Sequence, residues 1–191
     1  VCDLVNVPGD NRTCIDIRPM LDAYPFHGNT IQMTNLLTRI QRAILFDFSH
    51  KYGAPVFGTL NRTEYELGEY PIFALEASIQ PIRLLFKTQV RMLAQYLGLP
   101  PAIQDKIPTI DTWLGKLDQI NRTKIVTIGI PIVDQILKYS LDLGLSVDAI
   151  TRLGFKKEDV EFVIWMRNAN EYKHALPVLP GLEQVFDERE W

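Results

Sequence analysis

The segment Gly58–Glu64, which reads Gly-Thr-Leu-Asn-Arg-Thr-Glu, constrains the fold more than any other part of this chain. It directly follows the short apolar run 54–57, and together they predict a buried strand that ends in Gly-Thr and a helix that begins at Asn61. Ligands of open α/β sheets bind in the crevice at the carboxyl ends of the strands. The hydroxyl of Thr59 and the carboxylate of Glu64 are therefore candidates for contact with a nucleotide and its metal ion. A second interpretation needs no ligand, because Asn61 followed three residues later by Glu64 is close to a capping box.

The length and composition of the chain limit the class of protein. A chain of 191 residues is long enough for one domain with a sizeable core. Its formal net charge of -3 gives no electrostatic reason to expect a nucleic acid partner. The longest apolar run, 125–132, is too short to span a bilayer, and no signal peptide is visible. Cys2 and Cys14 are too few for a disulfide framework or a zinc site. We therefore expect a cytoplasmic protein with no membrane and no nucleic acid partner.

Hydrophobic periodicity and turn residues predict the order of the elements. The predicted strands are 4–7, 13–17 and 54–57, and the predicted helices are 30–52, 61–69, 85–97, 131–143, 146–153 and 156–171. The segments 19–29, 70–81 and 106–128 lack a clear period and are predicted to be loops. Long loops inside a compact domain are often functional. The pattern favours an α/β fold with a helical last third.

Several basic residues are candidates for binding an anionic ligand. Asn35, Arg39 and Arg42 share one face of the predicted helix 30–52, where an arginine fork suits a carboxylate or a phosphate. The alternative is a solvated basic face. Lys87 lies in the first helical turn, where the helix dipole favours an acid, so it indicates either a phosphate partner or a solvated lysine.

Two further candidates lie near the ends of predicted elements. Thr109, with Asp111 close by, falls in the predicted loop 106–128, where its hydroxyl either contacts a ligand or takes part in a turn. Lys173 follows the last predicted helix, between Tyr172 and His174, where cations also suit a helix C-terminus.

Some common devices are missing from the sequence. The closest pair of glycines, Gly53 and Gly58, is five residues apart, so there is no glycine-rich turn to enclose phosphates with backbone amides. No Ser or Cys lies in a nucleophile-elbow context, and no His/Cys/Asp group has metal-ligand spacing. Chemistry by this chain would depend on positioning and charge.

These segments, in this order, resemble the ammonia-dependent NAD synthetases of the N-type ATP pyrophosphatase superfamily. Residues 34–39 resemble the family's Asn-x-x-x-Arg segment, 58–64 its Gly-Thr-x-Asn-Lys-x-Glu signature, 86–98 its Tyr-Lys-Thr-Gln-Val helix, 106–113 its Lys-x-Pro-Ser/Thr-Ala loop and 171–177 its His-Lys-Arg segment. Each match is short, but the ordered set covers about residues 13 to 180. The resemblance implies an adenine-nucleotide alpha-hydrolase-like (Rossmann-like) domain with a parallel sheet and a helical C-terminal part.

The resemblance also implies a role for each candidate residue. Thr59, Lys87 and Thr109 are expected to contact ATP, Glu64 to help bind Mg²⁺, and Arg39 and Lys173 to bind the dinucleotide substrate. No residue is expected to act as a catalytic nucleophile. The implied activity is that of a ligase of NAD biosynthesis, which amidates nicotinic acid adenine dinucleotide with ammonia through an adenylate. A homodimer is implied by the family alone.

The sequence departs from the family pattern in two places. The family's Ser-Gly-Gly-x-Asp-Ser phosphate loop is absent from residues 1–191, and its Lys-Tyr-Gly-Asp-Gly-Gly stretch is replaced by Glu69–Glu76. We therefore expect a single NAD-synthetase-like domain whose N-terminal strand-loop-helix is missing from these residues or is supplied by another chain. Two alternatives remain: a catalytically degenerate relative that binds a nucleotide or a partner, and an amide-forming ATP pyrophosphatase with a different acid substrate.

Overall fold

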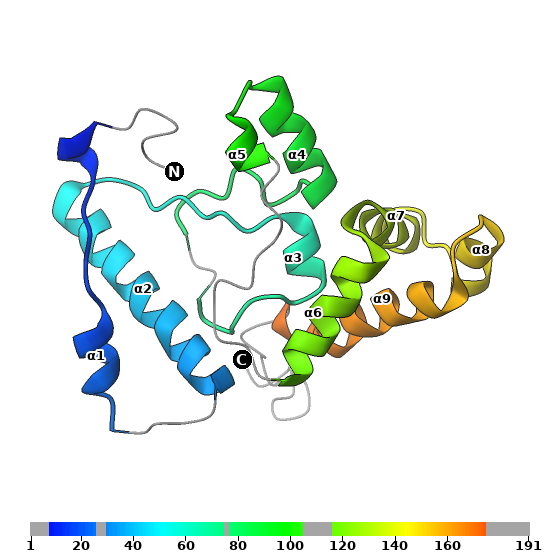
Figure 1. Cartoon of the computed structure of the whole chain (residues 1–191), viewed down its shortest axis with the longest axis horizontal. Helices are drawn as coiled ribbons and strands as arrows, with labels where there is room; N and C mark the ends of the chain where they lie inside the picture. Colours follow the sequence, from blue (N-terminus) through cyan, green and yellow to red (C-terminus); the bar gives the residue numbers. More distant parts are fainter. Residues whose placement is uncertain (1–7, 26–29, 75–76, 105–115, 175–191) are drawn as a thin grey trace, which may run out of the picture.

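The computed structural model describes residues 8–25, 30–74, 77–104 and 116–174. Helices dominate this part of the chain (Figure 1). In chain order they are η1 (Gly9–Asn11), α1 (Arg18–Asp22), α2 (Thr30–Tyr52), α3 (Arg62–Glu66), α4 (Lys87–Tyr96), α5 (Pro101–Gln104), α6 (Lys116–Ile128), α7 (Ile130–Leu141), α8 (Val147–Arg152), α9 (Lys157–Ala169) and η2 (Glu171–Lys173). The predicted helical C-terminal part is confirmed.

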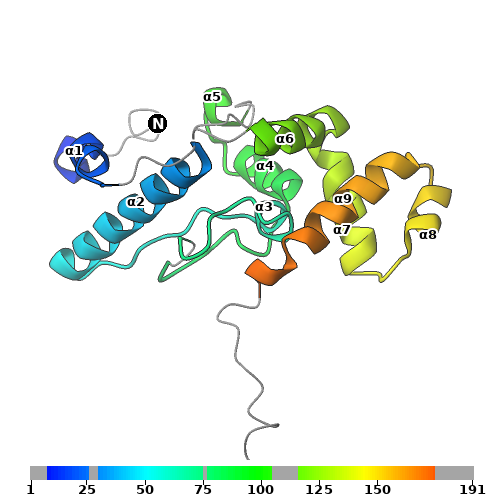
Figure 2. The ribbon, with the colours of Figure 1, turned by 90° about the horizontal axis from the view of Figure 1, so that it is seen from below.

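The helices form two groups with an extended segment between them. Helices α6 to α9 gather on one side of the molecule, and α2 lies on the other side with α1 against it (Figures 1 and 2). The chain that joins α2 to α4 runs between the two groups and carries α3 (Figure 1). Residues from distant parts of the sequence therefore meet along this segment.

The hydrophobic core lies in the C-terminal group and is centred on α7. This helix packs against α3, α4, α6, α8 and α9. Val133, Ile136 and Leu137 of α7 are at most 1% exposed, and they meet Ile150 of α8 and Val160 of α9. Burying one such aliphatic side chain contributes about 1.5–3 kcal/mol, so α7 fixes the positions of the helices around it.

The predicted parallel sheet is not formed by the described residues, which contain no strand. They contain one isolated parallel bridge, between Phe57 and Ile79. Around it, the Gly58 amide donates to the Ile79 carbonyl at 2.8 Å and the Ile79 amide donates to the Val56 carbonyl at 3.1 Å. The parallel orientation of this bridge agrees with the predicted parallel sheet. In the described residues, however, no further segment pairs with the bridge to extend it into a sheet. The segment 13–17 is not a strand, and 4–7 lies outside the described residues.

Two loop predictions are wrong. Residues 116–128 of the predicted loop 106–128 form α6, in which Ile125 and Ile128 are buried against the core. Their tertiary contacts stabilise a helix that the weak local period did not reveal. Part of the predicted loop 19–29 forms α1, whose Pro19 suits a first helical turn.

The other helix predictions are confirmed, with small shifts at the ends. The bounds of α2 are the predicted 30–52. Ser146 caps α8 by accepting from the Ala149 amide at 3.3 Å. The helix predicted over 156–171 ends at Ala169 and continues into the short 3-10 helix η2.

Candidate functional site

A cavity of about 590 Å³ opens between α2, the segment 58–74 and the C-terminal helices. Four of the predicted site residues line it: Arg39 from α2, Thr59 just before α3, Glu64 from α3 and Lys173 from η2. Asn35 and Arg42 also line it, so the predicted polar face of α2 is turned toward the cavity. Thr109 lies outside the described residues.

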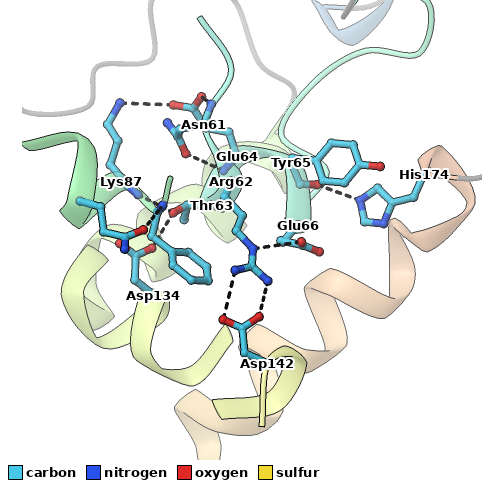
Figure 3. Close-up of polar contacts among 12 residues, drawn as sticks. Asn61, Arg62, Thr63, Glu64, Tyr65, Glu66, Lys87, Asp134, Asp142 and His174 are labelled. Atoms are coloured by element: carbon cyan, nitrogen blue, oxygen red, sulfur yellow. Dashed lines mark hydrogen bonds and ion pairs between the residues drawn. The ribbon is translucent and has the colours of Figure 1, made fainter. Parts of the chain in front are cut away.

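The capping box predicted at the start of α3 is confirmed. The Asn61 side chain accepts from the Glu64 amide at 3.0 Å, and Glu64 Oε2 accepts from the Asn61 amide at 3.2 Å (Figure 3). Asn61 is only 1% exposed. The cap therefore fixes the direction in which the Glu64 carboxylate points.

The second oxygen of Glu64 faces Lys87. The Lys87 Nζ atom lies 3.3 Å from Glu64 Oε1 (Figure 3). Both side chains are about 30% exposed, so this ion pair contributes no more than about 1 kcal/mol to stability. The partner of Lys87 in this structure is thus a carboxylate, so the lysine is not fully solvated, and its contact with ATP stays a prediction.

The helix dipole favours an acidic side chain at the start of α4, and Asp134 of α7 provides it. Asp134 of α7 accepts from the Thr88 amide through Oδ2 at 2.8 Å, and Thr63 accepts from the Lys87 amide at 2.8 Å. The Phe86 amide donates to the Gln89 side chain. The first amides of α4 are therefore satisfied within the protein. Sequence reasoning missed Asp134 because it lies in the middle of an apolar helix.

The arginines of α2 bind the backbone of the segment that departs from the family pattern. Arg39 donates from Nε and Nη2 to the Ile72 carbonyl at 3.2 and 3.1 Å, and Arg42 donates to the Ala74 carbonyl at 3.2 Å. Both guanidinium groups thus fix this segment against α2. Arg39 is still exposed, as a solvated face predicts, whereas Arg42 is half-buried.

Lys173 joins η2 to the segment that follows α3. Its Nζ atom donates to the carbonyls of Gly68 at 2.6 Å and Tyr70 at 3.1 Å. Next to it, the His174 ring stacks on Tyr65 with 4.2 Å between ring centroids. Lys173 lines the cavity and places a positive charge in its wall.

Glu69 is a second carboxylate in the cavity wall. Burial raises the pKa of its carboxyl group above the ordinary value, and the positive charge of Arg122 on α6 opposes that shift. Burial also raises the pKa of the neighbouring Tyr70 phenol to about 12, so this hydroxyl stays neutral. One signal in the sequence could have indicated Glu69, namely its place at the start of the replaced stretch Glu69–Glu76.

The chemistry of Glu64 fits a magnesium ion that takes most of its ligands from elsewhere. Mg²⁺ is commonly held by one or two carboxylates together with substrate phosphates and water. Glu64 can provide one such oxygen. Among residues 8–25, 30–74, 77–104 and 116–174, no group of three or more His, Cys, Asp or Glu side chains could hold a metal ion. A magnesium ion at Glu64 would therefore need further ligands from substrate phosphates and water.

None of the helices in the described part of the chain combines the length and the apolar character needed to cross a membrane.

Comparison with known proteins identifies relatives over most of the chain. The sequence model of the family described as NAD synthase matches residues 2–177. The NH(3)-dependent NAD(+) synthetase of Fusobacterium nucleatum is 31% identical over 178 residues, which cover 91% of this chain and 67% of that protein. The protein of the same name from Trichlorobacter lovleyi is 31% identical over 175 residues, covering 90% of this chain and 63% of that protein. The chain thus spans about two thirds of the length of these relatives.

Two solved structures have a similar fold. An NMN synthetase from Francisella tularensis matches with a TM-score of 0.70 and 24% identity, over 94% of this chain and 69% of that one. An NH3-dependent NAD synthetase from Campylobacter jejuni matches with a TM-score of 0.66 and 24% identity, over 87% of this chain and 64% of that one. The similarity of fold to these two structures supports the predicted fold family.

Proposed function

Because this chain belongs to the NAD synthase family, we propose that it is an ammonia-dependent, ATP-dependent amide ligase that converts nicotinic acid adenine dinucleotide to NAD. The observation that supports this most directly is the cavity in which Arg39, Thr59, Glu64 and Lys173 meet. These residues come from segments far apart in the sequence, and each occupies a position to which the family resemblance gives a binding role.

In the proposed reaction, the substrate carboxylate attacks the α-phosphorus of ATP, which forms an acyl adenylate and releases pyrophosphate. Ammonia then attacks the acyl carbon, AMP leaves, and a proton is lost from nitrogen. Neither step requires a protein nucleophile. The chain's contribution is to hold the reactants in position and to neutralise charge on the phosphates.

The proposed ATP site lies at the start of α3. Thr59 is exposed beside the bridged residue pair, where its hydroxyl can meet the nucleotide. When ATP binds, the Lys87 ammonium group would pair with the ATP phosphates in place of Glu64. The Glu64 carboxylate would then provide one ligand to Mg²⁺. When bound, Mg²⁺ would supply further positive charge to the phosphates. Thr109 remains a predicted ATP contact.

The proposed dinucleotide site lies toward α2 and η2. Arg39 uses Nε and Nη2 for the Ile72 carbonyl, which leaves Nη1 to donate to a phosphate of the dinucleotide. Lys173, on η2, contributes a second positive charge to the cavity wall. An anionic substrate between these two cations suits the cavity electrostatically.

We also propose that the parallel bridge between Phe57 and Ile79 belongs to the parallel sheet of an adenine-nucleotide alpha-hydrolase-like fold. The similarity to the Francisella and Campylobacter structures supports this proposal. Homodimerisation is proposed from the family alone, and light scattering on the purified protein tests it.

The activity is tested by incubating the purified protein with nicotinic acid adenine dinucleotide, ATP, Mg²⁺ and ammonia. We expect AMP and NAD to form in equal amounts, with no NAD when ammonia is left out. Tight ATP binding with no AMP release would support the degenerate, binding-only alternative. AMP release only with another carboxylic acid would support the alternative of a different acid substrate. Either result would reject the proposed function.

A further inference from the structure

Asp134 is a buried carboxylate whose two oxygens both accept hydrogen bonds from other helices. Its Oδ1 accepts from the Thr63 hydroxyl at 2.6 Å, and its Oδ2 accepts from the Thr88 amide at 2.8 Å and the Thr88 hydroxyl at 2.6 Å. Asp134 is 5% exposed, and Thr63 is 3% exposed. Removing a carboxylate from water is costly unless its oxygens are bonded. The three donors therefore have to keep their positions around Asp134.

These bonds lead directly to the proposed ATP site. The Thr63 hydroxyl, which donates to Asp134, also accepts from the Lys87 amide at 2.8 Å. Thr63 adjoins Glu64 on α3, and Lys87 adjoins Thr88 on α4. Figure 3 shows this series of hydrogen bonds and ion pairs, which runs from Asp134 through Thr63 to Lys87 and then to Glu64. The residues bonded to Asp134 are thus the immediate neighbours of the Lys87–Glu64 pair.

We propose that Asp134 is a positioning residue of the nucleotide site. It holds the first turns of α3 and α4 at the separation that places Lys87 Nζ 3.3 Å from Glu64 Oε1, and so places both groups for ATP and Mg²⁺. Asp134 acts through Thr63 and Thr88, because its oxygens are occupied by those donors. This inference rests on the proposed function of the cavity.

A second aspartate, at the C-cap of α7, provides a matched control. Asp142 bonds to Arg62 on α3, at 2.5 Å from Nη2 and 3.1 Å from Nη1. It therefore joins the same two helices, α7 and α3, as the Asp134–Thr63 bond does. In the described part of the chain it makes no hydrogen bond or ion pair with α4, and its side chain is 35% exposed. Loss of Asp142 removes a link between α7 and α3 without disturbing the donors around Asp134.

The first experiment measures the affinity for ATP with Mg²⁺ by calorimetry, at a temperature where every variant is folded. We expect Asp134→Asn and Thr63→Val to weaken binding by about tenfold or more, since loss of a charge-assisted hydrogen bond is worth at least one such factor. Thr63→Ser keeps the hydroxyl, so its affinity for ATP should stay within about twofold of wild type. The control variant Asp142→Asn should also bind ATP within about twofold of wild type. Equal losses in Asp134→Asn and Asp142→Asn, or no rescue by Thr63→Ser, would overturn the proposal. If Asp134→Asn does not fold, the Thr63→Val and Thr63→Ser pair still decides.

The second experiment needs no ligand. Hydrogen exchange of the Thr88 amide should be about tenfold faster in Asp134→Asn than in Asp142→Asn, because only the first variant changes the acceptor of that amide. The Lys87 amide should follow, because its acceptor Thr63 is itself held by Asp134. Unchanged exchange would overturn the positioning role. If wild-type protein fails to bind ATP with Mg²⁺, the proposed function itself fails and the nucleotide role of Asp134 fails with it. The exchange result then reports separately whether Asp134 fixes the start of α4.

Discussion

The Glu64 carboxylate takes part in two interactions at once. One oxygen closes the capping box with the Asn61 amide, and the other faces the Lys87 ammonium group. A helix cap and a ligand site are therefore compatible at this residue. The cap holds the carboxylate in one orientation, so that a metal ion would meet a ligand that is already positioned.

We predict that Glu64→Gln abolishes most activity while the fold survives. Glutamine keeps the capping box, so the free energy of unfolding should fall by no more than about 1 kcal/mol. Outer-shell partners of metal ions already contribute about 10–100-fold, and loss of a ligand should reduce AMP release by at least that factor. Glu66→Gln on the same helix is the control, since Glu66 faces Arg62. A fully active Glu64→Gln protein would contradict the metal role.

A pH dependence is expected from Glu69, whose pKa burial raises in the folded state. Between the ordinary and the raised pKa, the folded state binds more protons than the unfolded state, so stability falls as pH increases through that window. Glu69→Gln should remove this part of the slope and should be more stable than wild type above the raised pKa. Urea unfolding of both proteins from pH 4 to pH 8 measures the difference. Parallel stability curves would show that the Glu69 carboxyl is not buried in solution.

At the scale of elements, hydrogen bonds from cationic side chains to backbone carbonyls join the segments that line the cavity. Helix α2 has little contact with the core, and its two arginines bind the carbonyls of Ile72 and Ala74. From η2, Lys173 binds the carbonyls of Gly68 and Tyr70. The loop that departs most from the family pattern is thus fixed at both ends by cations.

Gly68, just after α3, lies against Asn170, the C-cap residue of α9. Its φ of +67° lies in the left-handed region, and a Cβ there would overlap the side chain of Asn170. We predict that Gly68→Ala lowers the free energy of unfolding by about 2 kcal/mol or more, from backbone strain of about 1–2 kcal/mol plus overpacking. Gly144→Ala has a similar φ of +62° with open space around the new Cβ, so it should show the strain alone. Equal losses in the two variants would show that contact with Asn170 adds nothing.

At the scale of the whole molecule, stability and binding belong to different regions. The apolar core is formed by α7 and the helices around it, while the cavity lies between this core and α2. Asp134 connects the two regions, since it projects from the central core helix to the starts of α3 and α4. A site with exposed charges is thereby supported by a rigid neighbour.

We predict that Leu137→Ala destabilises the whole protein. Leu137 is 1% exposed at the centre of α7, and truncation of a buried leucine costs about 2–5 kcal/mol. Leu153→Ala, at a leucine that is 55% exposed, should change stability by less than about 1 kcal/mol. Thermal unfolding with two probes, circular dichroism and tryptophan fluorescence, measures both effects. Similar losses in the two variants would mean that the core is not centred on α7.

Local features of this protein were predictable from the sequence. The bounds of α2 and the cap at Asn61 follow from apolar spacing, side-chain hydrogen bonding and the breaking residue Gly53, which act within one or two helical turns. The ordered motifs were enough to identify the family. For these features the residues that decide the structure are near neighbours in the chain.

Other features depended on the tertiary structure. Helix α6 is stabilised by core contacts of Ile125 and Ile128 that its own period does not indicate. The partners of Lys87 and Asp134 come from residues 23 to 71 positions away along the chain, and the raised pKa of Glu69 comes from burial. Sequence by itself therefore determined the local elements and the family. Only the tertiary structure decided which charges meet, because burial and pairing are set by side chains that distant segments bring together.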